Sequence, residues 1–118
     1  MKAISHVTVF VRDLKKAAEF YEKKLGFRKT MMAEEFGWAE LKTPSVVLAL
    51  SRPSGGERKL VGRFTGIVFE SRDVRKTCEE LKRKGIKITE EPVKKAWGGM
   101  VAAFVDPDGN EFTLMEQR

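Results

Sequence analysis

Apolar and polar residues alternate in two stretches of the chain, 4–11 and 65–71, both rich in Val, Ile and Phe. A period of two is typical of a strand that buries one face, so both stretches are predicted to be strands. An aspartate follows each stretch, Asp13 in the first case and Asp73 in the second, and apolar residues at helical spacing come next. Because an aspartate side chain accepts N–H groups of a first helical turn, each is expected to cap a helix.

The same pattern occurs twice, since a shift of 60 residues places Asp13 on Asp73. Each helix is expected to end at a glycine, Gly26 or Gly85, which tolerates the left-handed conformation that closes a helix. Further strands are predicted at 27–31, 37–41 and 46–50 in the first half and at 86–89, 100–105 and 111–115 in the second. The order is therefore β-α-β-β-β twice, and we predict an α+β fold of two tandem βαβββ modules.

Two segments without periodicity complete this organisation. Residues 106–109, Asp-Pro-Asp-Gly, have the preferences of a type I turn followed by a left-handed glycine, so both aspartates are assigned to structure. Residues 52–60 are rich in Pro, Ser and Gly, which is typical of a linker. One domain, 1–118, is therefore predicted, with module one at 1–51, the linker at 52–60 and module two at 61–118.

Strand alternation also predicts a pocket. Neither half can bury both faces of its sheet, so the two sheets are expected to pack into a cup that encloses a cavity. If Val7, Val9 and Val11 face the helix, the alternate residues face the cavity. The predicted lining positions are His6, Thr8, Phe10, Gly66, Val68, Glu70, Glu111, Thr113 and Met115. A one-residue slip would instead turn Val7, Val9, Ile67, Phe69, Phe112 and Leu114 toward the cavity.

Composition narrows the classes of function. The chain carries 23 Lys and Arg against 17 Asp and Glu, a net charge of +6, which favours an anionic or neutral ligand over a cationic one. Its basic runs alternate with glutamates on the predicted helices, a pattern typical of a solvated face, so no nucleic-acid partner is expected. One asparagine and one glutamine, with abundant Lys and Glu, are typical of thermophilic proteins.

The single cysteine, Cys78, excludes an internal disulfide framework and a cysteine-rich zinc site. It occupies a helix position that requires a small apolar residue, so core packing is favoured over a nucleophile. No signal sequence and no membrane-spanning apolar run is visible, and we expect a cytoplasmic protein without a membrane partner.

Large apolar side chains near the predicted strand ends allow two interpretations. Trp97, before Gly98 and Gly99, either closes over a planar ligand in the pocket or packs at a sheet edge. Trp38 has the same two interpretations. The pair Met31 and Met32 either lines an adaptable pocket or packs at a strand end.

The repeated module, the opening segment ISHVTVFVRDLKKAAEFYEKKLGF at 4–27 and the closing segment WGGMVAAFVDPDGNEFTLME at 97–116 together resemble the vicinal oxygen chelate superfamily. That superfamily contains glyoxalase I, extradiol dioxygenases, fosfomycin-resistance enzymes and bleomycin-binding proteins. The resemblance implies a glyoxalase/bleomycin-resistance/dioxygenase-like fold and a homodimer. In the enzymes it also implies a divalent metal in the cup, held by a first-strand His and a last-strand Glu of each module.

Only one of those four ligands is present here. His6 falls on the first-strand histidine of module one, but the repeat position holds Gly66 and the last-strand position of module two holds Thr113. The equivalent in module one lies within 46–50, where every residue is aliphatic. Since catalytic divalent ions require three or more protein ligands, we expect no metal cofactor of the usual kind.

Three functions follow as hypotheses. The favoured one is a protein that binds a small molecule in the cup without the metal. The alternative is a metal-dependent lyase, isomerase or dioxygenase of glyoxalase type, with a site rebuilt from His6, Glu70 and Glu111. The third is a structural module whose cup has collapsed. His6 itself is a ligand-binding group, a general base, a relic metal ligand or a pocket-wall residue, and no catalytic residue is assigned.

Overall fold

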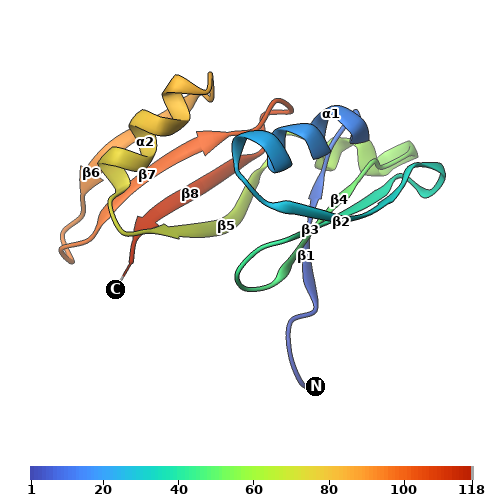
Figure 1. Ribbon diagram of the computed structural model, residues 1–118, viewed down its shortest axis with the longest axis horizontal. Coiled ribbons are helices and arrows are strands. Elements are labelled where there is room, and N and C mark those ends of the chain that lie inside the picture. Colours follow the sequence, from blue (N-terminus) through green and yellow to red (C-terminus); the bar gives the residue numbers. More distant parts are fainter. Residues whose placement is uncertain (118) are drawn as a thin grey trace. The chain divides into compact units, whose positions relative to one another are not determined.

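The computed structural model describes residues 1–117, and the chain forms two compact units, Met1–Gly62 and Arg63–Arg118 (Figure 1). Each unit contains a four-stranded mixed sheet and its own helix, so the fold is α+β with two tandem βαβββ modules. The segment 52–60, expected as a linker, contains a 3₁₀ helix and lies in the first unit. Among residues 1–117, no helix combines the length and apolarity needed to cross a membrane.

The first unit has the strand order β1-β4-β3-β2, in which β1 and β4 are parallel and the other pairs antiparallel. Its elements are β1 (His6–Phe10), α1 (Leu14–Glu19), the π-helix η1 (Phe20–Lys24), β2 (Arg28–Ala33), the 3₁₀ helix η2 (Glu34–Phe36), β3 (Trp38–Lys42), β4 (Val47–Ser51) and the 3₁₀ helix η3 (Gly55–Leu60).

The second unit repeats this topology in the order β5-β8-β7-β6, with β5 and β8 parallel. Its elements are β5 (Phe64–Ser71), α2 (Val74–Arg83), β6 (Ile88–Lys94), β7 (Met100–Val105) and β8 (Glu111–Glu116). Helix α2 covers one face of this sheet (Figure 1).

Both predicted helix caps are present. The backbone of Asp13 is extended and its side chain accepts the Lys16 N–H at 3.0 Å, while Asp73 accepts the Lys76 N–H at 3.1 Å. The regular first helix is shorter than expected, because after Glu19 the chain continues as the π-helix η1.

Each core lies between the sheet and its helix. In the first unit Val9, Val11 and Tyr21 are buried, together with alternate residues of β3 and the three central residues of β4. In the second unit Val74 and Cys78 of α2 pack with strand residues of β7 and β8. Three phenylalanine rings, Phe69, Phe104 and Phe112, contact one another with centroids 5.3 to 6.1 Å apart.

The turn at 106–109 forms as predicted. Gly109 donates its N–H to the Asp106 carbonyl at 3.0 Å and adopts φ 85°. The Asp106 carboxylate, which is buried, accepts the N–H groups of Asp108 and Asn110, both at 2.9 Å. Asn110 is also buried and accepts the Arg63 N–H through its side-chain oxygen, so the turn is tied to the start of β5.

The caps can be tested by substitution. Asp13→Ala and Asp73→Ala are each expected to lower the free energy of unfolding by about 1 kcal/mol, because an N–H group of the first turn loses its acceptor. The measurement is urea denaturation followed by circular dichroism. The matched controls are Asp13→Asn and Asp73→Asn, which keep an acceptor oxygen and should lose far less. Equal losses in the Ala and Asn variants would contradict the capping role.

Candidate functional site

The open face of the first sheet, on the side away from α1, carries a cluster of polar and aromatic side chains. Directly paired residues of neighbouring strands point to the same face of a sheet. Thr8 of β1 pairs with Ala49 of β4, which pairs in turn with Glu40 of β3. Phe10 likewise shares a row with Trp38 through β4. The open face therefore brings β1 and β3 residues together.

Three of these side chains contact one another. The His6 and Trp38 rings meet edge to face, with centroids 5.6 Å apart and an interplanar angle of 90°. The Trp38 indole donates its Nε1–H to Glu40 Oε2 at 2.8 Å. His6 Nδ1 lies 3.2 Å from Ser5 Oγ, and the His6 side chain is exposed. We call His6, Trp38 and Glu40 the open-face cluster.

Sequence reasoning missed Glu40. The signal was available in the alternation of residues 38–42, because Ala39 and Leu41 are fully buried and the residues between them must face the other way. For Trp38 the sequence had left two interpretations open, and its contacts place it on the same face as His6.

The open face of the second sheet carries the other predicted positions. Burial alternates along β5, where Gly66, Val68 and Glu70 are exposed. It also alternates along β8, where Phe112 and Leu114, on either side of Thr113, are buried. Glu111 Oε2 accepts a hydrogen bond from Thr89 Oγ1 at 2.7 Å.

Within each unit, the strands therefore turn the expected alternate residues toward the helix. Val9, Phe112 and Leu114 are buried, and Phe69 packs on the core cluster around α2. These four belong to the set that a one-residue slip would have turned outward. That the nine predicted positions line one cavity stays a prediction.

Gly66 stands where the resemblance implies a second metal-binding histidine. Its φ is +74°, and the register of β5 against β8 shifts between Phe64 and Val68. Thr65 stabilises this bulge, since its Oγ1 donates to the Glu111 carbonyl at 2.8 Å and accepts the Ile67 N–H at 3.1 Å. A positive φ favours glycine over any residue with a side chain, so the local backbone disfavours a histidine here.

The donor set does not fit the family's metal. On the open face of the first sheet, the β4 neighbours of His6 and Thr8 are Val47 and Ala49, which have no donor atoms in their side chains. Within residues 1–117, no three His, Cys, Asp or Glu side chains gather into a group that could hold a metal ion. A role of His6 as a metal ligand therefore stays a prediction.

Trp97 lies in the turn between β6 and β7. Lys95 donates its N–H to the Gly99 carbonyl at 2.8 Å, and Gly98 adopts φ 100°. The indole lies over Gly99, where a Cβ atom would come within 1.8 Å of the ring. The backbone conformation and the neighbouring indole therefore explain why glycine occupies positions 98 and 99. A role of the half-exposed Trp97 in the pocket stays a prediction.

Cys78 packs in the core of the second unit and is 2% exposed. Burial raises the pKa of its thiol, and the Glu91 carboxylate raises that pKa further. A protonated, inaccessible thiol is a poor nucleophile, which agrees with the packing role expected for it.

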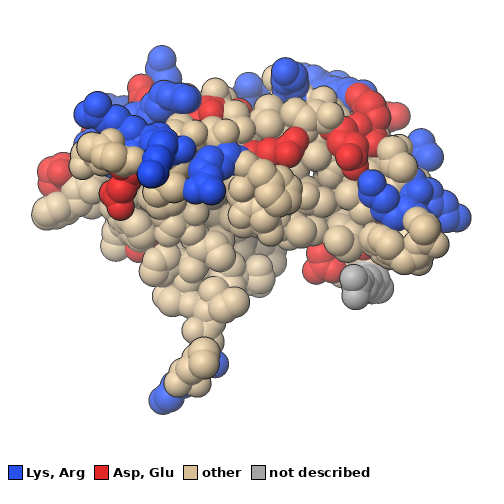
Figure 2. Space-filling model, turned by 180° about the vertical axis from the view of Figure 1, so that it is seen from behind, with Lys and Arg blue, Asp and Glu red and all other residues tan. Residues whose placement is uncertain are grey.

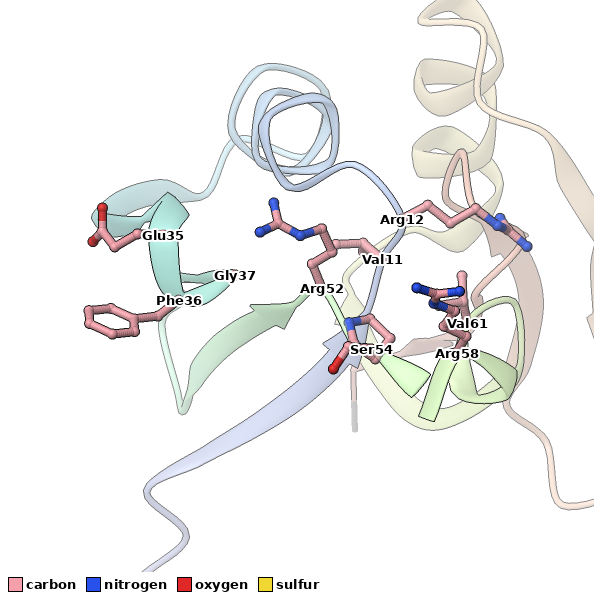
Figure 3. A pocket seen from close by; sticks show the side chains of 10 residues that line it. Val11, Arg12, Glu35, Phe36, Gly37, Arg52, Ser54, Arg58 and Val61 are labelled. Atoms are coloured by element: carbon pink, nitrogen blue, oxygen red, sulfur yellow. The ribbon is translucent and has the colours of Figure 1, made fainter. Parts of the chain in front are cut away.

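Apart from the open sheet faces, a cavity of about 550 Å³ lies in the first unit, at the ends of β1 and β4 (Figure 3). No pattern in the sequence had indicated it, because its residues come from four separate segments. Its lining is Val11, Arg12, Glu35, Phe36, Gly37, Arg52, Pro53, Ser54, Arg58 and Val61. On the face that Figure 2 shows, basic and acidic side chains are interleaved. Lys82 and Glu91 form an exposed ion pair at 2.8 Å.

Comparisons with known proteins agree with this architecture. Residues 3–114 match the family model described as the Glyoxalase/Bleomycin resistance protein/Dioxygenase superfamily. The chain is 34% identical over 124 residues to the uncharacterized protein YetH of Bacillus subtilis, covering 98% of this chain and 99% of that protein. It is 31% identical over 121 residues to a probable lactoylglutathione lyase of Synechocystis, covering 94% and 92%.

Two solved structures are similar over almost their whole length. A member of the same superfamily from Sphaerobacter thermophilus superposes with a TM-score of 0.88 at 31% identity, covering 99% of this chain and 98% of that one. TnmS3, an antibiotic binding protein from Streptomyces, superposes with a TM-score of 0.81 at 25% identity, covering 100% and 98%.

The reactivity of the Cys78 thiol can be measured directly. A thiol reagent such as 5,5′-dithiobis(2-nitrobenzoate) at pH 8 should react slowly with the folded protein and completely after denaturation, because the thiol is buried and its pKa is raised. The variant Arg75→Cys, which adds an exposed thiol on the same helix, should show one fast and one slow reaction. Equal rates for the two thiols would contradict the assignment.

Proposed function

The chain belongs to the Glyoxalase/Bleomycin resistance protein/Dioxygenase superfamily, and within it we propose a protein that binds a small molecule at the open sheet faces without the usual metal. The observation that carries the proposal is the open-face cluster. Its three side chains offer an indole platform, an imidazole and a carboxylate on a sheet face that also presents Thr8 and Phe10. Small-molecule sites have this composition, a mainly apolar wall with a few polar groups that orient the ligand.

The cluster favours a planar or aromatic ligand. Trp38 is held in place by its hydrogen bond to Glu40 and by the edge of His6, so its indole is an ordered surface for stacking. His6 is exposed and can donate or accept a hydrogen bond according to its tautomer. The net charge of +6 attracts anions over long distances, which supports an anionic or neutral ligand.

Absence of the family metal from this site is supported by the donor set. Gly66 has a backbone that disfavours histidine, and the β4 residues paired with His6 and Thr8 are Val47 and Ala49, which have no donor atoms in their side chains. The similarity to the antibiotic binding protein TnmS3 supports a binding function on this fold. We extend that function to this chain only as a binder of small molecules.

The alternative is a metal-dependent enzyme of glyoxalase type. The similarity to a probable lactoylglutathione lyase favours it, since that relative is matched over nearly its full length. In this alternative His6, Glu70 and Glu111 would hold the metal, although the Glu111 carboxylate already accepts the Thr89 hydroxyl.

Metal content separates the two functions. Protein purified without added metal should contain far less than one metal ion per chain, and Ni, Zn, Mn or Fe(II) salts should not raise its melting temperature, because residues 1–117 bring no three suitable ligands together. The same samples should show no lactoylglutathione lyase activity. The variant His6→Ala is the control and should leave the metal content unchanged. A bound metal near one equivalent that is lost in His6→Ala would favour the enzyme.

Ligand binding at the open face can be followed through tryptophan fluorescence, because the chain has only two tryptophans. In the variant Trp97→Phe, Trp38 is the sole reporter, and the aromatic anion 1-anilinonaphthalene-8-sulfonate should quench it saturably. Adding His6→Ala should weaken binding about tenfold, as for the loss of ~1.4 kcal/mol.

The matched control is Trp38→Phe, in which only Trp97 reports. Its emission should change little, because this variant lacks the indole on which the aromatic anion is proposed to stack. Saturable quenching of equal strength in both variants, or no effect of His6→Ala, would contradict the open-face site.

A further inference from the structure

We propose that the cavity at the ends of β1 and β4 is a second binding site, which takes the phosphate or carboxylate group of a small organic anion through Arg52 and Arg58. We call it the arginine pocket. Its volume of about 550 Å³ lies within the ~300–1,000 Å³ typical of small-molecule sites. The pocket therefore has room for an organic part beside the anionic group.

Local backbone structure fixes one of the two arginines. Gly37 adopts φ 62°, and its carbonyl accepts the Arg52 N–H at 2.8 Å. A Cβ at Gly37 would lie 3.1 Å from the Arg52 carbonyl, so the close approach of these two segments, together with the positive φ, favours glycine. The Arg52 Nη2 donates to the Glu34 carbonyl at 3.2 Å, which orients the guanidinium and leaves its other N–H groups for a ligand.

The second arginine comes from another element. Arg58 lies in η3, whose last turn is closed by the Val61 N–H on the Arg58 carbonyl at 3.2 Å. Figure 3 shows Arg52 and Arg58 on either side of Ser54, with the Arg12 side chain directed away from Arg52. The pocket is thus framed by basic side chains from three segments of the first unit.

The charge balance of the lining favours an anion. Neither Arg52 nor Arg58 forms an ion pair with a carboxylate in the described part of the chain. Glu35 is the single carboxylate among the lining residues, against the two arginines Arg52 and Arg58. A guanidinium presents its N–H groups in a planar fork that matches carboxylate and phosphate oxygens, and such charge-assisted hydrogen bonds are the strong ones.

The arginine pocket is separate from the open-face cluster, since neither His6, Trp38 nor Glu40 lines it. Val11, which does line it, is buried on the side of β1 that faces the helix. The two sites can therefore fail independently when tested.

The test is titration of the ¹⁵N-labelled protein with sodium phosphate and, separately, with sodium acetate, at an ionic strength held constant with sodium chloride. Saturable shifts of the Arg52 and Arg58 Nε–H signals are expected with at least one anion, and the stronger of the two identifies the preferred group. Arg58→Gln should weaken binding about tenfold, because a charge-assisted hydrogen bond is lost. Glu35→Gln should strengthen it, because the one carboxylate of the lining is neutralised.

The matched control is Arg75→Gln, which removes the same charge from an exposed position on α2. It should leave the affinity unchanged, and the melting temperature of Arg58→Gln checks that this variant folds. An equal loss in Arg75→Gln, or shifts that never saturate, would show attraction by net charge alone and would overturn the proposal. His6→Ala should not alter these titrations, so failure here leaves the open-face proposal standing.

Discussion

One helix can cover only one face of a four-stranded sheet, and this constraint organises both units. Valine, leucine and phenylalanine side chains fill the covered face, where Val9, Leu50 and Phe112 are buried. The opposite face must then present whatever side chains the intervening positions carry. In the first unit these include His6, Trp38 and Glu40, and Trp38 contacts both of the others. The packing that stabilises the fold therefore also decides which residues are available for binding.

Features with local physical causes could be predicted from the sequence. Asp13 and Asp73 cap helices because one side-chain oxygen reaches the third residue on, and the turn at 106–109 follows from the preferences of its own residues. Strand faces followed from a period of two. The π-helix after Glu19, in which Phe20 and Tyr21 are buried, could not be predicted, because π-helices are rare and the spacing of apolar residues here is typical of an α-helix. The arginine pocket was missed for a similar reason, since only the fold brings Arg52 and Arg58 together.

At Gly66 the departure from the family pattern involves the backbone conformation as well as the identity of the side chain. A β-bulge with a positive φ replaces a regular strand position, and Thr65 holds that bulge through two hydrogen bonds. Reintroducing a histidine side chain would act against the backbone as well as change the chemistry. The difference between this chain and the metal-binding pattern therefore involves the backbone of β5 around Gly66 as well as the missing side chain.

The buried turn around Asp106 bears on the chemical lifetime of the protein. Deamidation of asparagine begins when the backbone nitrogen of the next residue attacks the side-chain carbonyl. Asn110, the only asparagine in the chain, is 1% exposed, and its amide nitrogen donates to Asp106 at 2.9 Å. The nitrogen that would attack, that of Glu111, donates its hydrogen to the Arg63 carbonyl at 2.9 Å. Both reacting groups are held in place, so deamidation of Asn110 is suppressed for as long as the second unit stays folded.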